Sequence, residues 1–255
     1  MQYIIISVSI FAMYLIPYSC FGQLQHDHYF YYESRQVNSN KWIVLLPGSS
    51  GLTIFDDQTF YHRQAETLQS RGFDVILIDY KKYYKESKSP SKPKGTTGDK
   101  IAWVVQQVIE LSKSKHEIDS LSVGHLLGWS LAGEGVIQLV EDTSFIKRHN
   151  IKSAALYYPS NQENRRVSTI IPLLVQVGEF DNVVKTKKLQ ESFISNHKLL
   201  FITYANSFHG FDVETLDKAK HIRFPPIFGK KYKFQYNAQE AVKARNLLFE
   251  FLNQY

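Results

Sequence analysis

The chain has 255 residues, of which 44% are hydrophobic and one is cysteine. This composition excludes a disordered chain and a disulfide-dense scaffold, and the length suits one α/β domain. The net charge of +6 comes largely from a lysine-rich segment, 81–100. We interpret that segment as a solvated loop, with weak contact to an acidic surface as the alternative. Its aromatics, Tyr83 and Tyr84, are too few to indicate a nucleic-acid partner.

The first 22 residues differ from the rest of the chain. A short apolar run fills them, and no charged residue precedes Asp27. We predict that residues 1–22 are a signal peptide cleaved after Gly22, so that the protein is secreted or periplasmic. The alternative is membrane anchoring, through an uncleaved N-terminus or a lipid on Cys20. Cleavage would leave 23–255 as a single domain with no thiol nucleophile and no cysteine-based metal site.

Strand candidates occur along the whole chain and alternate with helical patterns. Most are continuous apolar runs, which are typical of strands buried on both faces of a parallel sheet. The alternation predicts a doubly wound α/β sheet. The predicted strands are 29–34, which we place at an edge, 42–46, 74–79, 123–127, 152–158, 173–178 and 199–204.

The helical patterns lie at 57–70, from a cap at Asp99 onward, at 131–140 and at 238–253. Their apolar residues recur at helical spacing. Two proline- and glycine-containing segments, 87–98 and 211–236, match neither pattern. We predict that both are loops that overhang one end of the sheet and shape access to a substrate.

One motif indicates chemistry directly. The sequence Gly128-Trp129-Ser130-Leu131-Ala132-Gly133 follows an apolar strand and begins a helical pattern. A serine with small residues two positions before and after it, on a strand-to-helix turn, is typical of a nucleophile elbow. We therefore predict that Ser130 is a catalytic nucleophile.

A serine nucleophile needs a base and an acid that orients the base. In α/β-hydrolases the chain order is serine, acid, histidine. Asp181 follows the strand 173–178, with Glu179 as the nearest rival for the acid. His209 follows the strand 199–204 and precedes a glycine. We predict that Asp181 and His209 are the acid and the base.

Two backbone amides should stabilise the oxyanion that forms during the reaction. We expect one from Leu131, next to the nucleophile. The second should come from Ser49 in the turn after strand 42–46, with Ser50 as the alternative. Trp129, Ser50 and Tyr158 are the candidates for substrate binding, and burial in the core is the alternative for the two aromatics.

With these motifs in place, the chain resembles the dienelactone hydrolase family of α/β-hydrolases from about residue 40 to the C-terminus. The resemblance is carried by Pro47-Gly48-Ser49-Ser50-Gly51, by the elbow, by Gly178-Glu179-Phe180-Asp181 and by Ser207-Phe208-His209-Gly210-Phe211. It implies a mostly parallel sheet of about eight strands, and an esterase or lactonase that uses Ser130, Asp181 and His209 with neither metal nor organic cofactor. Family members named for dienelactone cleavage carry cysteine at the elbow, whereas this chain has serine.

The expected function is hydrolysis of a small-molecule carboxylic ester or lactone through an acyl-enzyme. A peptidase or an acyltransferase on the same three residues is the alternative enzyme class, since loops set the leaving group and the acceptor. A non-catalytic secreted binding scaffold is the alternative outside the enzymes.

Overall fold

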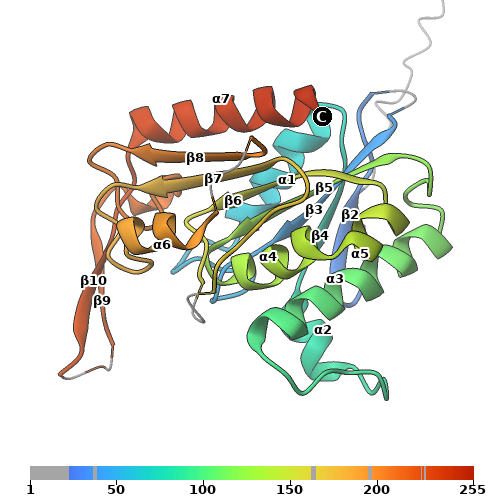
Figure 1. Cartoon of the computed structure of the whole chain (residues 1–255), viewed down its shortest axis with the longest axis horizontal. Coiled ribbons are helices and arrows are strands. Elements are labelled where there is room, and N and C mark those ends of the chain that lie inside the picture. The colour runs from blue at the N-terminus through green and yellow to red at the C-terminus, as the bar shows by residue number, and fades with distance from the viewer. Residues whose placement is uncertain (1–22, 37–38, 162–164, 195–196, 225, 227) are drawn as a thin grey trace, which may run out of the picture.

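The computed structural model describes residues 23–36, 39–161, 165–194, 197–224, 226 and 228–255. The predicted signal peptide, 1–22, including Cys20, lies outside the described residues. The main sheet has eight strands in the order β1-β2-β4-β3-β5-β6-β7-β8 (Figure 1). The strands are β1 (Gln23–Gln25), β2 (Tyr29–Tyr32), β3 (Lys41–Leu46), β4 (Asp74–Ile78), β5 (Val123–Trp129), β6 (Ile151–Tyr157), β7 (Leu173–Gly178) and β8 (Leu199–Tyr204).

Strands β3 to β8 run parallel to one another, and β1 and β2 extend the β4 edge in antiparallel pairs. The central strands are buried along nearly their whole length. Burial on both faces explains why they read as continuous apolar runs in the sequence. The predicted doubly wound, mostly parallel sheet is confirmed.

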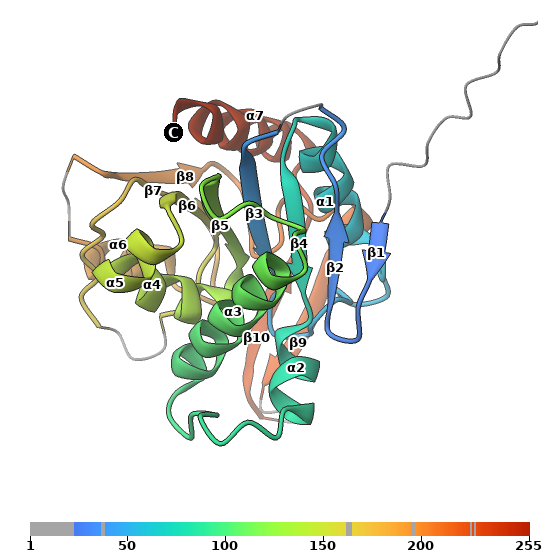
Figure 2. The same cartoon turned by 90° about the vertical axis from the view of Figure 1, so that its right-hand side faces the viewer.

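Helices cover both faces of this sheet (Figures 1 and 2). On one face lie α1 (Phe60–Ser70) and α7 (Ala238–Gln254), and on the other α3 (Thr97–Ser114), α4 (Gly133–Glu141) and α5 (Thr143–Arg148). Two shorter helices, α2 (Tyr80–Glu86) and α6 (Thr186–Ser192), follow β4 and β7. In the described part of the chain, no helix combines the length and hydropathy needed to cross a membrane.

The start of α3 corrects one predicted cap. The N-cap is Thr96 rather than Asp99, and its side chain accepts a hydrogen bond from the Asp99 amide. The Asp99 carboxylate in turn accepts from the Thr96 amide at 2.7 Å. This reciprocal pair is a capping box, in which the acid belongs at the third helical position.

The lysine-rich segment 81–100 is only partly a loop, so this prediction was wrong in part. Residues 80–86 form α2, because the Asp79 side chain caps the helix at the Lys82 amide and Tyr80 is buried beneath it. The loop proper spans 87–96, since α3 begins at Thr97. Lysine-rich stretches form helices readily when one end is capped and one side chain is buried.

The segment 211–236, predicted as a loop, contains a hairpin of its own. Strands β9 (Lys220–Phe224) and β10 (Lys230–Phe234) pair in antiparallel fashion outside the main sheet. The hairpin projects beyond the end of the sheet (left in Figure 1). A single bridge between His209 and Phe234 joins the end of β10 to the loop after β8. The hairpin therefore lies beside His209, the predicted catalytic base, and forms part of the wall around it.

Candidate active site

The predicted nucleophile lies where the sheet topology changes direction. The chain passes from β3 to β4 on one side and then to β5 on the other, so β3 and β5 are neighbours. The loops that leave the carboxyl ends of these two strands carry Ser49 and Ser130. Ligands of open α/β sheets bind in the crevice at such a switch point.

The turn at Ser130 is a strained strand-to-helix turn. Ser130 has a φ of +51°, a left-handed conformation that few non-glycine residues adopt and that recurs at functional sites. A 3₁₀ turn, Ser130–Ala132, leads directly into α4, and the Ser160 amide donates to the Ser130 carbonyl at 2.8 Å. A Cβ on Gly128 would lie 3.2 Å from the Val136 side chain, so the elbow needs a very small residue there.

Three side chains that are far apart in the sequence meet at this turn. His209 Nε2 lies 3.0 Å from Ser130 Oγ, and His209 Nδ1 lies 2.7 Å from Asp181 Oδ2. His209 and Asp181 are both buried, each with 4% of its surface exposed. The other Asp181 oxygen accepts from the Val183 and Val184 amides at 2.9 and 3.1 Å.

The rival acid, Glu179, points elsewhere. Its carboxylate accepts from the Asn206 amide at 3.0 Å and so braces the loop that carries His209. A carboxylate can only accept hydrogen bonds, so the contact with Asp181 requires the His209 ring to carry its proton at Nδ1. His209 Nε2 is then the acceptor that faces the Ser130 hydroxyl.

Close backbone contact holds the loops of Asp181 and His209 together. The Phe180 amide donates to the Ser207 carbonyl at 2.8 Å, and the Glu179 amide to the Tyr204 carbonyl at 2.9 Å. A Cβ on Gly178 would lie 2.4 Å from the Ser207 oxygen. Only glycine allows the two loops to approach this closely.

Two buried phenols fix the turn that carries the predicted oxyanion donor. The Gly48 amide donates to the Tyr61 hydroxyl at 2.8 Å, and the Tyr80 hydroxyl donates to the Gly48 carbonyl at 3.1 Å. Burial raises the pKa of both phenols, so they remain protonated. With the Gly48 amide occupied by Tyr61, the next amides of the turn, at Ser49 and Ser50, are the candidates for the oxyanion. Neither Tyr61 nor Tyr80 was predicted from the sequence.

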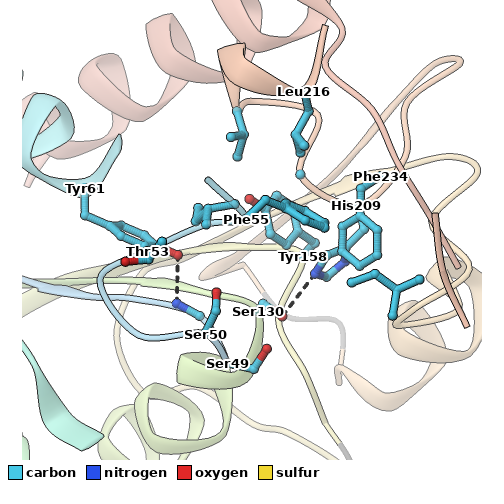
Figure 3. Close-up of a pocket in the computed structure, with 15 residues that line it drawn as sticks. Ser49, Ser50, Thr53, Phe55, Tyr61, Ser130, Tyr158, His209, Leu216 and Phe234 are labelled. Carbon is cyan, nitrogen blue, oxygen red and sulfur yellow. Dashed lines mark hydrogen bonds between the residues drawn. The ribbon is translucent and has the colours of Figure 1, made fainter. Parts of the chain in front are cut away.

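An apolar cavity of about 430 Å³ opens over Ser130 and His209 (Figure 3). Of the residues proposed for substrate binding, Ser50 and Tyr158 line it, as does Ser49. Most of the wall is apolar and comes from the segment after β3, the segment after His209 and the β9–β10 hairpin, namely Ile54, Phe55, Val213, Leu216, Ile222 and Phe234. Phe234 belongs to β10, so the hairpin forms part of this wall.

A second cavity, of about 390 Å³, lies against the same serine. Ser49, Ser130 and Leu131 line it, so both predicted oxyanion donors border this space. Its remaining lining is more polar and comes from the segments that follow β6 and β7, namely Ser160, Asn161, Val183, Val184, Lys185 and Lys188.

Trp129 does not line either cavity, which corrects its predicted role. Its indole is 1% exposed and stacks on Tyr157, with ring centres 5.3 Å apart and planes 9° apart. The indole N–H donates to Asp212 at 2.8 Å. The residue before the nucleophile turns its side chain into the core, because successive residues of β5 alternate between faces.

Asp212 is a partly buried carboxylate that sequence reasoning missed. It accepts from the Tyr158 hydroxyl at 2.7 Å as well as from Trp129. Burial raises the pKa of this carboxyl, and the two hydrogen bonds partly oppose the shift. The Tyr158 ring packs on the His209 ring at a centroid distance of 4.3 Å. Asp212 thus supports the base through the side chain of Tyr158.

No metal site accompanies these residues in the described part of the chain, where no three His, Cys, Asp or Glu side chains are grouped to hold an ion. The fold and the serine at the switch point define the protein as an α/β-hydrolase. The chain belongs to the dienelactone hydrolase family, whose profile matches residues 30–255. This membership supports a hydrolase activity. No curated protein matches the sequence.

Solved structures agree with this fold at low sequence identity. A putative dienelactone hydrolase from Klebsiella pneumoniae has a TM-score of 0.59 and 11% identity, covering 89% of this chain and 92% of its own. A predicted CIB-like hydrolase from Thermoplasma acidophilum has a TM-score of 0.55 and 15% identity, covering 92% of this chain and 100% of its own. Thermogutta terrifontis esterase 2, phosphoramylated by tabun, has a TM-score of 0.53 and 13% identity, covering 89% of this chain and 88% of its own.

Proposed function

We propose that the protein is a serine esterase that hydrolyses carboxylic esters or lactones through an acyl-enzyme. The observation that carries this proposal is the continuous hydrogen-bonded series from Ser130 through His209 to Asp181. A serine hydroxyl is a weak nucleophile until a base accepts its proton. The apolar cavity above Ser130 offers room for the organic part of an ester.

In the first step, Ser130 Oγ attacks the ester carbonyl while His209 Nε2 takes the hydroxyl proton. Asp181 holds the imidazole in the required tautomer and stabilises the imidazolium that forms. The backbone amides of Leu131 and Ser49 donate to the oxyanion. His209 then protonates the leaving alcohol, and a water molecule repeats the sequence on the acyl-enzyme.

The test is hydrolysis of a small aryl ester by the wild-type protein and by Ser130→Ala. We expect turnover to fall by several orders of magnitude in the variant, as removal of a triad member generally causes. Equal turnover by a correctly folded Ser130→Ala protein would overturn the proposal. Amide substrates and alternative acceptors in the same assay separate an esterase from a peptidase or an acyltransferase.

A further inference from the structure

The two cavities beside Ser130 differ sharply in character. The first is walled by apolar side chains such as Phe55, Leu216 and Phe234. The second is bordered by two lysines, Lys185 and Lys188, and none of the described residues that line it is acidic. A substrate that fills both cavities would therefore carry an apolar group on one side of its reacting carbonyl and an anionic group on the other.

The two lysines are placed by the same turn that holds the acid. The Val183 and Val184 amides bind Asp181, and Lys185 follows directly with a φ of +56° at the start of α6. Lys188 lies in the first turn of α6, and both lysines line the same cavity. Both lysine side chains are exposed, so they can reach a ligand without first breaking a buried contact.

The position of the base decides which end of the substrate lies in which cavity. His209 must protonate the leaving oxygen, so that oxygen has to lie within hydrogen-bond reach of Nε2. Among the described residues, His209 lines the apolar cavity but not the lysine-bordered one. The alcohol therefore belongs to the apolar cavity, and the acyl chain extends into the lysine-bordered cavity.

We propose that the substrates are half-esters of dicarboxylic acids with an apolar alcohol, and that Lys185 and Lys188 bind the free carboxylate of the acyl chain. This inference rests on the proposed function, because it names the substrate class of the same serine. The ester C–O bond breaks, and the Ser130 proton passes through His209 to the departing alcohol. Water then releases the dicarboxylate, with one net proton set free at neutral pH.

The experiment compares three esters by titrating the released proton. Monohexyl glutarate carries the anion on the acyl side, hexyl hexanoate carries none, and the hexanoate ester of γ-hydroxybutyrate carries it on the alcohol side. We expect kcat/KM to be about tenfold higher for monohexyl glutarate than for either of the others, through a lower KM. The preference should shrink as salt rises, since screening shortens the reach of exposed charges.

Variants assign the effect to particular side chains. Lys185→Glu and Lys188→Glu should each remove the preference for monohexyl glutarate, measured as the ratio of its kcat/KM to that of hexyl hexanoate in the same variant. Lys187→Glu is the matched control, since Lys187 is exposed on the same helix but does not line the cavity. It should retain the preference.

Three results would overturn the inference while esterase activity persists: equal kcat/KM for the three esters, a preference for the γ-hydroxybutyrate ester, or an equal loss in Lys187→Glu. Failure of the proposed function looks different, because then no ester, charged or neutral, would show turnover that depends on Ser130.

Discussion

Substitution of Gly178 by alanine tests whether backbone contact positions the base. The added Cβ would lie 2.4 Å from the Ser207 oxygen and 2.6 Å from its carbonyl carbon. Because these are backbone atoms, the loop that carries His209 has to retreat by about 1 Å to restore an ordinary van der Waals contact. The retreat also stretches the 2.8 Å hydrogen bond from the Phe180 amide to the Ser207 carbonyl.

The cost should appear in both stability and rate. Overpacking of this kind lowers the free energy of unfolding by about 1–3 kcal/mol. A misplacement of about 1 Å in an active site can cost about 10²-fold in rate. We therefore expect kcat/KM of Gly178→Ala on a small aryl ester to fall between about tenfold and a hundredfold.

Gly124→Ala is the matched control for this experiment. A Cβ at Gly124 would lie 2.4 Å from the Trp42 ring, but Gly124 is near the start of β5, at the other end of the strand from Ser130. Urea unfolding and ester kinetics on both variants separate the two effects. Gly124→Ala should lose stability and retain kcat/KM per folded molecule. If Gly178→Ala also retained kcat/KM, the contact with Ser207 would have no role in positioning the base.

Substitutions at two further positions test polar groups that are buried or partly buried. Burial lowers the pKa of His125 to about 3, so the unfolded chain binds an extra proton below about pH 6.5 and folding weakens in acid. Between pH 7 and pH 5, the unfolding free energy of the wild type should fall by about 2 kcal/mol more than that of His125→Leu. Urea titrations at the two pH values measure both losses, and equal losses would refute this. Asp212→Ala leaves the Trp129 N–H and the Tyr158 hydroxyl without their acceptor, and should cost about 2 kcal/mol or more of unfolding free energy. Asp212→Asn retains an acceptor oxygen and should cost less in the same titration, so a loss equal to that of alanine would contradict the assignment.

The sheet could be predicted because its central strands are buried on both faces. Strand β3 is apolar from Trp42 to Leu46, and β7 is apolar except for Gln176. Such runs need no tertiary information to be recognised. The hairpin β9–β10 could not be predicted in this way. Its second strand reads Lys-Lys-Tyr-Lys-Phe, and it is held in place by contacts such as the Phe234 bridge to His209 rather than by a buried face of its own.

The site residues also differ in whether the sequence predicts their positions. Ser130, Asp181 and His209 each follow the carboxyl end of a predicted strand, where parallel strands bring their loops together, so their proximity could be expected. Asp212 carries no such signal in the sequence. Its partners Trp129 and Tyr158 are 83 and 54 residues away.

The role of Trp129 was misread for the same reason. A tryptophan beside a nucleophile suits a pocket or a core equally well in the sequence. Only the three-dimensional contact with Asp212 decides between them.

Export through residues 1–22 remains a prediction from the sequence.

The reactivity of Ser130 tests the central claim most directly. The full chain would be incubated with a fluorophosphonate, digested and mapped by mass spectrometry, alongside Ser130→Ala and His209→Ala. We predict one adduct, on the peptide that contains Ser130, which is absent from Ser130→Ala and forms far more slowly in His209→Ala because the base no longer activates the hydroxyl. No adduct on a folded wild-type chain, or an adduct that forms equally fast without His209, would contradict the proposed mechanism.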